Sequence, residues 1–422
     1  MFTGNKAMIM RECERRNSVR RVCDGTVDHT TFFHNIRGDL LISGYIAANT
    51  TLLANMITEY MKRGDMPTIV LSGHNELFEF LRQRQSAGEI NRVMISDPTD
   101  RNYHPFYGMN AQKLLHFVHL AAEAQGFSLL MDQVLQYAAA ALNIVSASYP
   151  MSLPAFTKLL KNDDDFISAY ALQLGLSNVI ADIIRGNHEA GVILRRALEK
   201  LEEVFEDVYD GEKDTKYNFQ SGAQGDVAVM AFYSVSADQK ILNSYLKEEL
   251  FFTLKRVPKI RVIVDEMEVD NVEEDELVKF LFQMKRQGKV ELIFVSKNAG
   301  ESAGSMQINF SNVVLSTHEE PAVMENLTKA LWGTYQYSFP APAAGAPPAL
   351  FFSFKTTVHW GIATEERLRV RAVDLYGQQG VFRRSSDLLA LKTTANDNIY
   401  LVSSSRFLPT GAQLPAVSGI GW

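Results

Sequence analysis

The feature that most limits the fold of this chain is an alternation of strand and helix patterns that stops for about a hundred residues and then resumes. Short apolar runs typical of buried strands occur at 39–44, 66–73 and 92–98, and segments with helical spacing of apolar residues separate them. Strands that alternate with helices along a chain form a parallel sheet with crossover helices. This part of the chain is therefore predicted to be an α/β domain.

Between about residue 109 and residue 209 the apolar spacing is helical throughout, over a length typical of one domain. The strand pattern then returns at 226–234 and continues in "IRVIVDEME" and "VELIFVSK". We expect a mostly parallel sheet flanked by helices, with an inserted all-α domain. The predicted divisions are an N-terminal segment with the first half of the α/β domain (1–108), the all-α insertion (109–212), the second half of the α/β domain (213–338), and a linker with a weakly β C-terminal region (339–422).

Three shorter segments carry local predictions. Residues 1–37 have the character of an irregular or small β segment. The stretch "FPAPAAGAPP" at 339–348 is rich in Pro and Ala, which predicts an extended, unstructured linker or surface loop. The run Asp163-Asp164-Asp165 is typical of a helix N-terminus, where the helix dipole favours negative charge.

Composition limits the class of protein. The net charge is −7, so a basic field over the whole protein that would attract nucleic acid is absent. No apolar run reaches the roughly 18 residues of a membrane helix, and the polar, basic N-terminus has no signal-peptide pattern. The two cysteines, Cys13 and Cys23, form no zinc-binding pair and are expected to be reduced thiols. We therefore expect a cytoplasmic protein.

The stretch "LLISGYIAANTTLL" at 40–53 has the strand-turn-helix layout of a phosphate-binding P-loop. Such a loop wraps phosphates with backbone N–H groups, and its Lys and its Ser or Thr contact the phosphates and the metal. Aligned on GxxxxGK[ST], the chain keeps Gly44 and Thr51 but has Asn49 in place of the second Gly and Thr50 in place of the Lys. Taken alone, the stretch is a weak signal, and an ordinary strand-turn-helix explains it better.

The strand "RVIVDEME" ends in Asp265-Glu266, which is the pattern of a Walker B strand. In such a strand the Asp holds Mg²⁺ and the Glu polarises the attacking water. The alternative is a strand whose exposed end carries two acids. Further along, Arg286-x-Gly288 and Ser296-Lys297-Asn298 follow a helix and a strand. These polar positions suit a nucleotide site, but a solvated helix end and turn would look the same.

The order of these pieces resembles the FtsK–HerA superfamily of P-loop ring ATPases, and most closely the coupling proteins of conjugation and type IV secretion. After the degenerate P-loop come "IVLSGHNELFEFL" and Asp97-Pro98 with Pro105-Phe106, then the helical insertion, the Walker B strand and the Arg-x-Gly turn. The resemblance covers about residues 36–405 at the level of pattern. It implies a P-loop (RecA-like) fold in which the all-α domain lies at one mouth of a hexameric ring.

The resemblance also implies a role for each motif residue. The nucleotide contacts would come from the loop and the first helical turn after the first strand: Gly44, Asn49, Thr50 and Thr51. The Mg²⁺ ligands would be Thr51 and Asp265. The catalytic side chains would be Asp265, Glu266 and Arg286. ATP and Mg²⁺ are the implied cofactors, and the implied partners are apparatus proteins, a DNA or protein substrate, and further copies of the chain.

Several positions depart from the family pattern. Asn49-Thr50 stands in place of the P-loop Gly-Lys, and Ser72-Gly73-His74 stands where the second strand is usually followed by Asp. The glutamine that typically ends the sensor strand is replaced by Lys297 or Asn298. Coupling proteins usually begin with transmembrane helices, and this sequence has no such segment. We therefore expect ATP and Mg²⁺ to bind weakly or not at all.

Three functions follow from these patterns. The first is a coupling-protein-like subunit with a degenerate nucleotide site, which recruits or organises substrate in a type IV secretion or conjugation apparatus. It would be cytoplasmic and peripheral to the inner membrane through its partners. The second is an active ATP-driven translocase of DNA or protein, in which another basic residue replaces the missing Lys. The third is an α/β protein unrelated to ATPases. Whether the chain is an enzyme is left open.

Overall fold

The computed structural model describes the larger part of the chain and divides it into two units. The first unit combines Met1–Asn55 with Phe294–Trp422, and the second is the continuous stretch Met56–Ile293. The described residues are 3–19, 21–23, 36–44, 49–72, 75–90, 93–96, 105–107, 109–127, 130–205, 227–231, 239–265, 276–296, 310–315, 321–342, 360–371, 388–393 and 396–403.

The second unit contains parallel strands, as the alternating pattern predicted. Strand β3 (Thr68–Ser72) pairs in parallel with β6 (Ile260–Asp265) on one side and with β5 (Val227–Ala231) on the other. Strand β4 (Val93–Ser96) pairs in parallel with β5, and β7 (Val290–Ser296) neighbours β6. The order in this unit is therefore β7-β6-β3-β5-β4, and the division between the units falls within β7.

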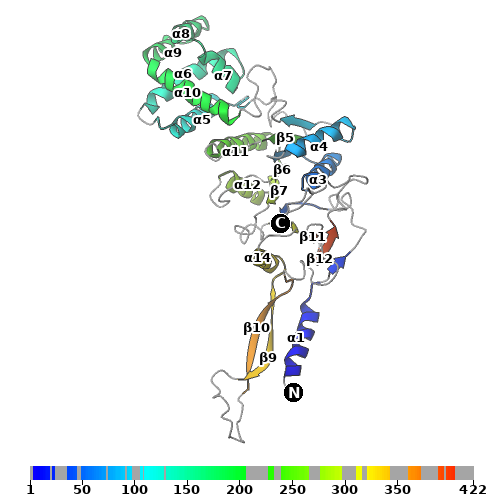
Figure 1. Ribbon diagram of the computed structural model, residues 1–422. Helices are drawn as coiled ribbons and strands as arrows, with labels where there is room; N and C mark the ends of the chain where they lie inside the picture. The colour runs from blue at the N-terminus through cyan, green and yellow to red at the C-terminus, as the bar shows by residue number, and fades with distance from the viewer. Residues whose placement is uncertain are drawn as a thin grey trace, which may run out of the picture. The chain divides into compact units, whose positions relative to one another are not determined.

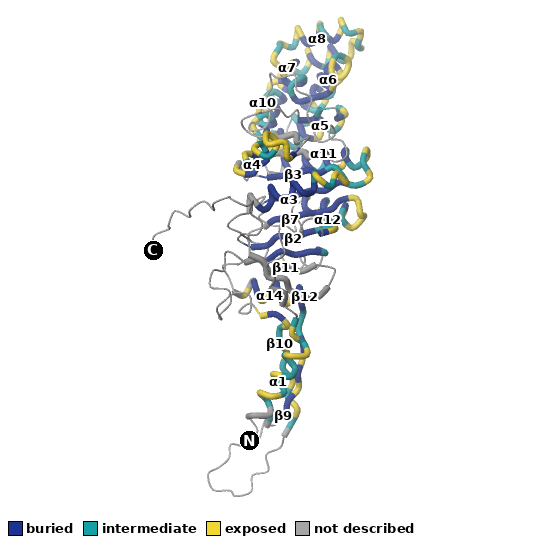
Figure 2. Tube along the Cα trace, turned by 90° about the vertical axis from the view of Figure 1, so that its right-hand side faces the viewer, coloured by how far each residue is buried: buried dark blue, intermediate teal, exposed yellow. Residues whose placement is uncertain are grey.

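Helices connect these strands, so each parallel pair is joined by a crossover. Helix α4 (Asn75–Ser86) follows β3, α11 (Gln239–Arg256) leads into β6, and α12 (Glu276–Arg286) leads into β7. Strands β3 and β6 are buried along their whole length, and Figure 2 shows this for β3. Continuous burial explains why these strands are apolar runs rather than alternating ones, because helices cover both faces of a parallel sheet.

The helical stretch of the sequence forms a group of six helices in the second unit (Figure 1). Several begin at a residue whose side chain caps the helix, such as Asn110, Ser152, Asp163 and Ser177. Among the helices that the structure describes, none combines the length and apolar character that a membrane crossing requires. The six helices are α5 (Ala111–Ala124), α6 (Met131–Ser148), α7 (Leu153–Leu160), α8 (Asp164–Gln173), α9 (Asn178–Gly186) and α10 (His188–Val204).

An aromatic cluster joins the start and the end of this helical group to α11. The Phe106 ring lies 4.7 Å from that of Tyr245 and 5.9 Å from that of Phe205, and it also contacts Phe117 at 5.0 Å. Phe106 is fully buried and adopts a φ of 64°, which is rare for a bulky residue. Its backbone N–H donates to the Tyr245 hydroxyl at 3.3 Å. The surrounding rings therefore hold a backbone conformation that the residue would not otherwise prefer.

The first unit contains a mixed sheet. Strand β2 (Leu40–Ser43) pairs in parallel with β8 (Asn312–Leu315), which pairs antiparallel with β11 (Leu388–Thr393). Strand β12 (Asn396–Ser403) pairs antiparallel with β11 and in parallel with β1 (Arg21–Cys23). Both β2 and β8 are buried along their whole length. Besides α1 (Thr3–Asn17), two helices contribute described residues to this unit: α14 (Pro321–Trp332), and the first turns of α3 (Asn49–Arg63).

A helix and a long hairpin make a separate packing arrangement within the first unit (Figure 1). Strands β9 (Thr334–Pro342) and β10 (Trp360–Leu368) pair antiparallel, and α1 (Thr3–Asn17) packs against β9. The alternate residues Tyr335, Tyr337 and Phe339 form a small core on one face of the hairpin, against which Ile9, Met10 and Cys13 pack. Ion pairs between Lys6 and Glu365 and between Glu14 and Arg367 connect the helix to β10.

Two sequence predictions for these segments are wrong in part. Residues 3–17 were expected to be irregular or β, and they form a helix because the hairpin supplies the apolar surface and the ion-pair partners that the polar helix lacks by itself. The linker expected at 339–348 is wrong for residues 339–342, which belong to β9 and pair with residues 360–363, and residues 343–348 lie outside the described residues. Antiparallel pairing outweighs the Pro-rich composition there, at the end of an edge strand where Pro is tolerated.

Candidate functional site

The carboxyl ends of β3 and β6 bring a hydroxyl and a carboxylate together. Ser72 is the last residue of β3, Asp265 is the last residue of β6, and the parallel register places them directly opposite each other. Each is 1% exposed. The Ser72 Oγ donates a hydrogen bond of 2.6 Å to Asp265 Oδ2. Open α/β sheets bind their ligands at this edge. The predicted Walker B carboxylate therefore lies at the ligand-binding edge of the sheet.

The environment of Asp265 suits a metal ligand. An ionised carboxylate is stable at a buried position only when hydrogen bonds or a cation replace water, and the Ser72 hydroxyl provides one such bond. Carboxylate oxygen is also the donor that Mg²⁺ prefers in proteins. The residues present therefore fit the ion that the fold implies. Glu266, the predicted water-polarising residue, lies outside the described part of the chain.

The predicted P-loop residues lie between β2 and α3. Gly44 directly follows β2, is buried, and has a φ of 101°. A residue with a side chain rarely adopts this conformation, so the turn after the strand depends on glycine. Asn49, Thr50 and Thr51 are the first three residues of α3, whose N-terminal N–H groups have no partner within the helix. The described backbone has a strand that ends at Ser43 and a helix that begins at Asn49, which is the order that the prediction requires, and residues 45–48 between them lie outside the described part of the chain.

Arg286 is the last residue of α12, and its side chain is exposed. Gly288, with a φ of 72°, closes the turn that follows. The predicted sensor residues Lys297 and Asn298 come directly after β7 but lie outside the described residues. The catalytic role of Arg286 stays a prediction.

Sequence reasoning missed a buried ion pair at the opposite ends of the same strands. Arg261 is 0% exposed, and its Nε donates to Glu291 Oε1 at 2.7 Å. Its two terminal nitrogens donate to Asp65 at 3.2 and 3.3 Å, and its guanidinium lies 3.9 Å from the centre of the Tyr60 ring. Arg261 is the second residue of β6, and Glu291 is the second residue of β7. A charged residue near the start of each apolar run was the sequence signal that could have indicated this ion pair.

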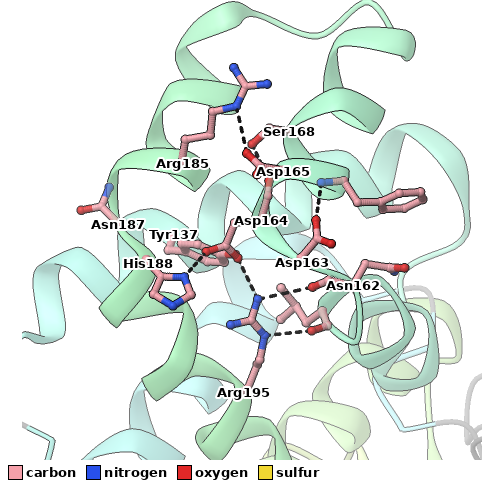
Figure 3. Close-up of polar contacts among 12 residues, drawn as sticks. Tyr137, Asn162, Asp163, Asp164, Asp165, Ser168, Arg185, Asn187, His188 and Arg195 are labelled. Atoms are coloured by element: carbon pink, nitrogen blue, oxygen red, sulfur yellow. Dashed lines mark hydrogen bonds and ion pairs between the residues drawn. The ribbon is translucent and has the colours of Figure 1, made fainter.

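Sequence reasoning also missed a polar cluster in the helical group (Figure 3). Asp164 Oδ1 accepts hydrogen bonds from the Tyr137 hydroxyl at 2.6 Å and from Arg195 Nη2 at 2.7 Å, and Asp164 Oδ2 lies 2.7 Å from His188 Nδ1. Burial alone would raise the pKa of Asp164, but the hydrogen bonds from Tyr137, His188 and Arg195 outweigh it and lower the pKa. Because these three bonds join Asp164 to side chains of two other helices, we assign the cluster a structural role.

The comparisons with known proteins found similarity in structure and none in sequence. No protein-family model matches the chain, and no curated protein matches its sequence. The bacterial conjugative coupling protein TrwB, in a trigonal form with sulphate, matches with a TM-score of 0.50 at 11% identity, over 91% of this chain and 93% of that chain. The plasmid coupling protein TrwB with ADP and Mg²⁺ matches with a TM-score of 0.45 at 12% identity, over 91% and 93%. VirB4 of Thermoanaerobacter pseudethanolicus matches with a TM-score of 0.38 at 14% identity, over 72% and 84%.

The match with the TM-score of 0.50 shows the fold. The chain has the α/β fold of RecA-like P-loop ATPases, and the predicted resemblance to the FtsK–HerA type is confirmed at the level of fold. An identity of 11% carries no residue roles from one chain to the other. What the nucleotide-site residues do is therefore argued from their own chemistry.

Proposed function

We propose that this protein is a coupling-protein-like P-loop subunit of a type IV secretion or conjugation apparatus, with a weakened nucleotide site and a role in recruiting or organising substrate. The observation that carries the proposal is the fold of a conjugative coupling protein over 91% of the chain. The sequence adds Thr50 at the place of the P-loop Lys. Partner proteins would hold such a subunit at the inner membrane.

The proposed nucleotide site uses the motif residues in distinct roles. The N-terminal N–H groups of α3, together with Gly44, would bind phosphate oxygens. Thr51 and Asp265 would hold Mg²⁺, and Glu266 would orient a water molecule. When bound, Mg²⁺ neutralises phosphate charge. The buried Asp265 carboxylate and its hydrogen bond from Ser72 support this assignment.

Thr50 removes one cation from this site. A single donor to developing negative charge contributes about 3–4 kcal/mol to transition-state stabilisation, or a factor of roughly 10²–10³ in rate. A neutral hydroxyl at this place provides no counter-charge to the phosphates. We therefore propose weak nucleotide binding and little or no hydrolysis.

An active translocase of DNA or protein is the second candidate. The observation that favours it is that Thr51, Asp265 and Glu266 keep the residue types that a hydrolysing P-loop site needs. Lys297, Arg286 or a basic residue of a neighbouring copy in a hexameric ring would then supply the missing charge.

Restoring the P-loop tests the proposal. In the double variant Asn49→Gly/Thr50→Lys we expect a thermal shift with Mg-ATP and phosphate release at least about 100-fold above wild type. The same variant with Glu266→Gln should keep the thermal shift and lose phosphate release. Wild-type phosphate release that Glu266→Gln abolishes would contradict the recruiting role and favour the translocase. A folded double variant that gains neither binding nor hydrolysis would count against a P-loop.

A further inference from the structure

Ser72 and Asp265 are neighbours because of strand register, and not because they are close in sequence. They stand 193 residues apart and become opposite each other when β3 pairs with β6. Both side chains are buried, and the bond of 2.6 Å between them has the short length of a hydroxyl that donates to a carboxylate. This bond fixes one oxygen of Asp265, so the carboxylate has a defined orientation.

The Asp265 carboxylate limits which side chains suit position 72. A hydroxyl can donate a hydrogen bond to the Asp265 carboxylate, whereas a second carboxylate at the same place would repel it. An apolar side chain would leave Asp265 Oδ2 without this donor in a site that is 1% exposed. Among small side chains, serine and threonine are therefore suited to donate to Asp265 and to fix its orientation.

We propose that Ser72 is a positioning residue, which holds the Asp265 carboxylate ready to take the Mg²⁺ of a bound nucleotide. The proposal rests on the proposed function, because it assumes that Asp265 serves a nucleotide site. It names a residue on a different strand from the P-loop and Walker B motifs as part of that site. Its action is on Asp265, and it needs no contact with the nucleotide.

The pairing itself is tested without nucleotide. We would measure urea unfolding of the full-length wild type, Ser72→Ala, Asp265→Ala and the double variant, and combine them in a double-mutant cycle. We expect a coupling of about tenfold in the unfolding equilibrium constant, the usual size for a hydrogen bond to a charged group. A coupling within twofold of unity would overturn the pairing and with it the proposal.

The role toward the metal is tested in the Asn49→Gly/Thr50→Lys background, where nucleotide binding is expected to be measurable. The thermal midpoint is recorded with ADP in EDTA and in rising MgCl₂. We expect Ser72→Ala to raise the Mg²⁺ concentration for a half-maximal ADP-dependent shift about tenfold, without changing the shift in EDTA. Ser72→Thr keeps the hydroxyl and should restore the requirement to within about threefold.

The control is Thr68→Ala, which removes a buried hydroxyl from the first residue of the same strand. It should lower the midpoint equally with and without Mg²⁺. If Ser72→Ala behaves like Thr68→Ala in a protein that does bind Mg-ADP, the proposal is wrong and the proposed function stands. If no variant shows an ADP-dependent shift although the coupling is present, the proposed function fails, and Ser72 has only a structural partner in Asp265.

Discussion

The carboxylate of Asp164 accepts hydrogen bonds from side chains of two other helices. Tyr137 belongs to α6, while His188 and Arg195 belong to α10, and Asp164 itself is the first residue of α8 (Figure 3). Hydrogen bonds to an ionised group are stronger than those between neutral groups. One residue therefore fixes the relative positions of three helices in the all-α insertion.

Replacing this carboxylate should change stability in a pH-dependent manner. The folded-state pKa of Asp164 is lowered, so its contribution is present above the unfolded pKa of about 3.9 and is lost as the pH falls through the folded-state value. We expect Asp164→Asn to reduce the free energy of unfolding by about 2 kcal/mol at pH 7 and by clearly less below pH 3. Urea unfolding at both pH values measures the difference.

Asp165→Asn is the matched control, because the Asp165 side chain is 95% exposed and lies 3.8 Å from Arg185. A change of less than about 0.5 kcal/mol is expected there. An effect of Asp164→Asn that stays the same at both pH values would contradict the assigned role of the ionised carboxylate.

Local sequence predicted part of this arrangement. The run of three aspartates indicated a helix N-terminus, and Asp163 does cap α8 by accepting from the Phe166 N–H at 2.7 Å. The run could not show that Asp164 bonds to Tyr137 and Arg195, because those partners are 27 and 31 residues away. The Ser72–Asp265 bond was hidden for the same reason, since it depends on which strands are neighbours.

At the scale of elements, Gly191 allows α10 to approach α6. A Cβ at this position would lie 2.9 Å from Cζ of the Tyr137 ring, closer than such atoms pack. The Tyr137 ring is fully buried and its hydroxyl is held by Asp164, so it has little freedom to move away. A glycine inside a helix normally weakens it, and close helix packing is the compensation here.

Gly191→Ala should therefore destabilise the protein. The clash is expected to cost about 1–3 kcal/mol, which exceeds the gain of up to about 1 kcal/mol in helix propensity. Gly186→Ala in α9 meets nothing within 4 Å and should be neutral or slightly stabilising. Chemical denaturation of both variants provides the comparison. A Gly191→Ala variant as stable as Gly186→Ala would mean that α6 and α10 pack less closely than described.

Element type followed from sequence wherever the apolar period was clear. The buried runs at β2, β3 and β6 and the helices between the strands were predicted. The hairpin of β9 and β10 was missed although "TYQYSFPAP" alternates in its first residues, because its Pro-rich end and the long connection to β10 suggested a linker. Helix α1 was missed because most of its residues are polar and its apolar partners, such as Tyr337, are over 300 residues away.

At the scale of the whole molecule, the all-α insertion begins and ends at neighbouring points. The rings of Phe106, before α5, and Phe205, after α10, have centroids 5.9 Å apart. Removing an insertion costs little when the two ends it leaves are close, because a short connection can join them.

A chain in which a short Gly-Ser linker replaces residues 110–203 should still fold. We expect a cooperative thermal transition and a circular dichroism spectrum with less helix, at lower stability because Tyr245 loses its contact with Phe117. Size-exclusion chromatography with a thermal melt measures both properties. A deletion variant without any cooperative transition would show that the α/β core depends on the insertion.

The division of the first unit between the two ends of the chain has a consequence during translation. The ribosome must make residues 44–311 after β2 before β8, its parallel partner, exists. At about 5–20 residues per second this takes roughly ten seconds to one minute. During that interval the nascent chain carries an apolar strand without this partner, while the second unit is synthesised as one continuous stretch. We therefore expect a ribosome-associated chaperone to bind β2 early in translation and to release it only after β8 has been made.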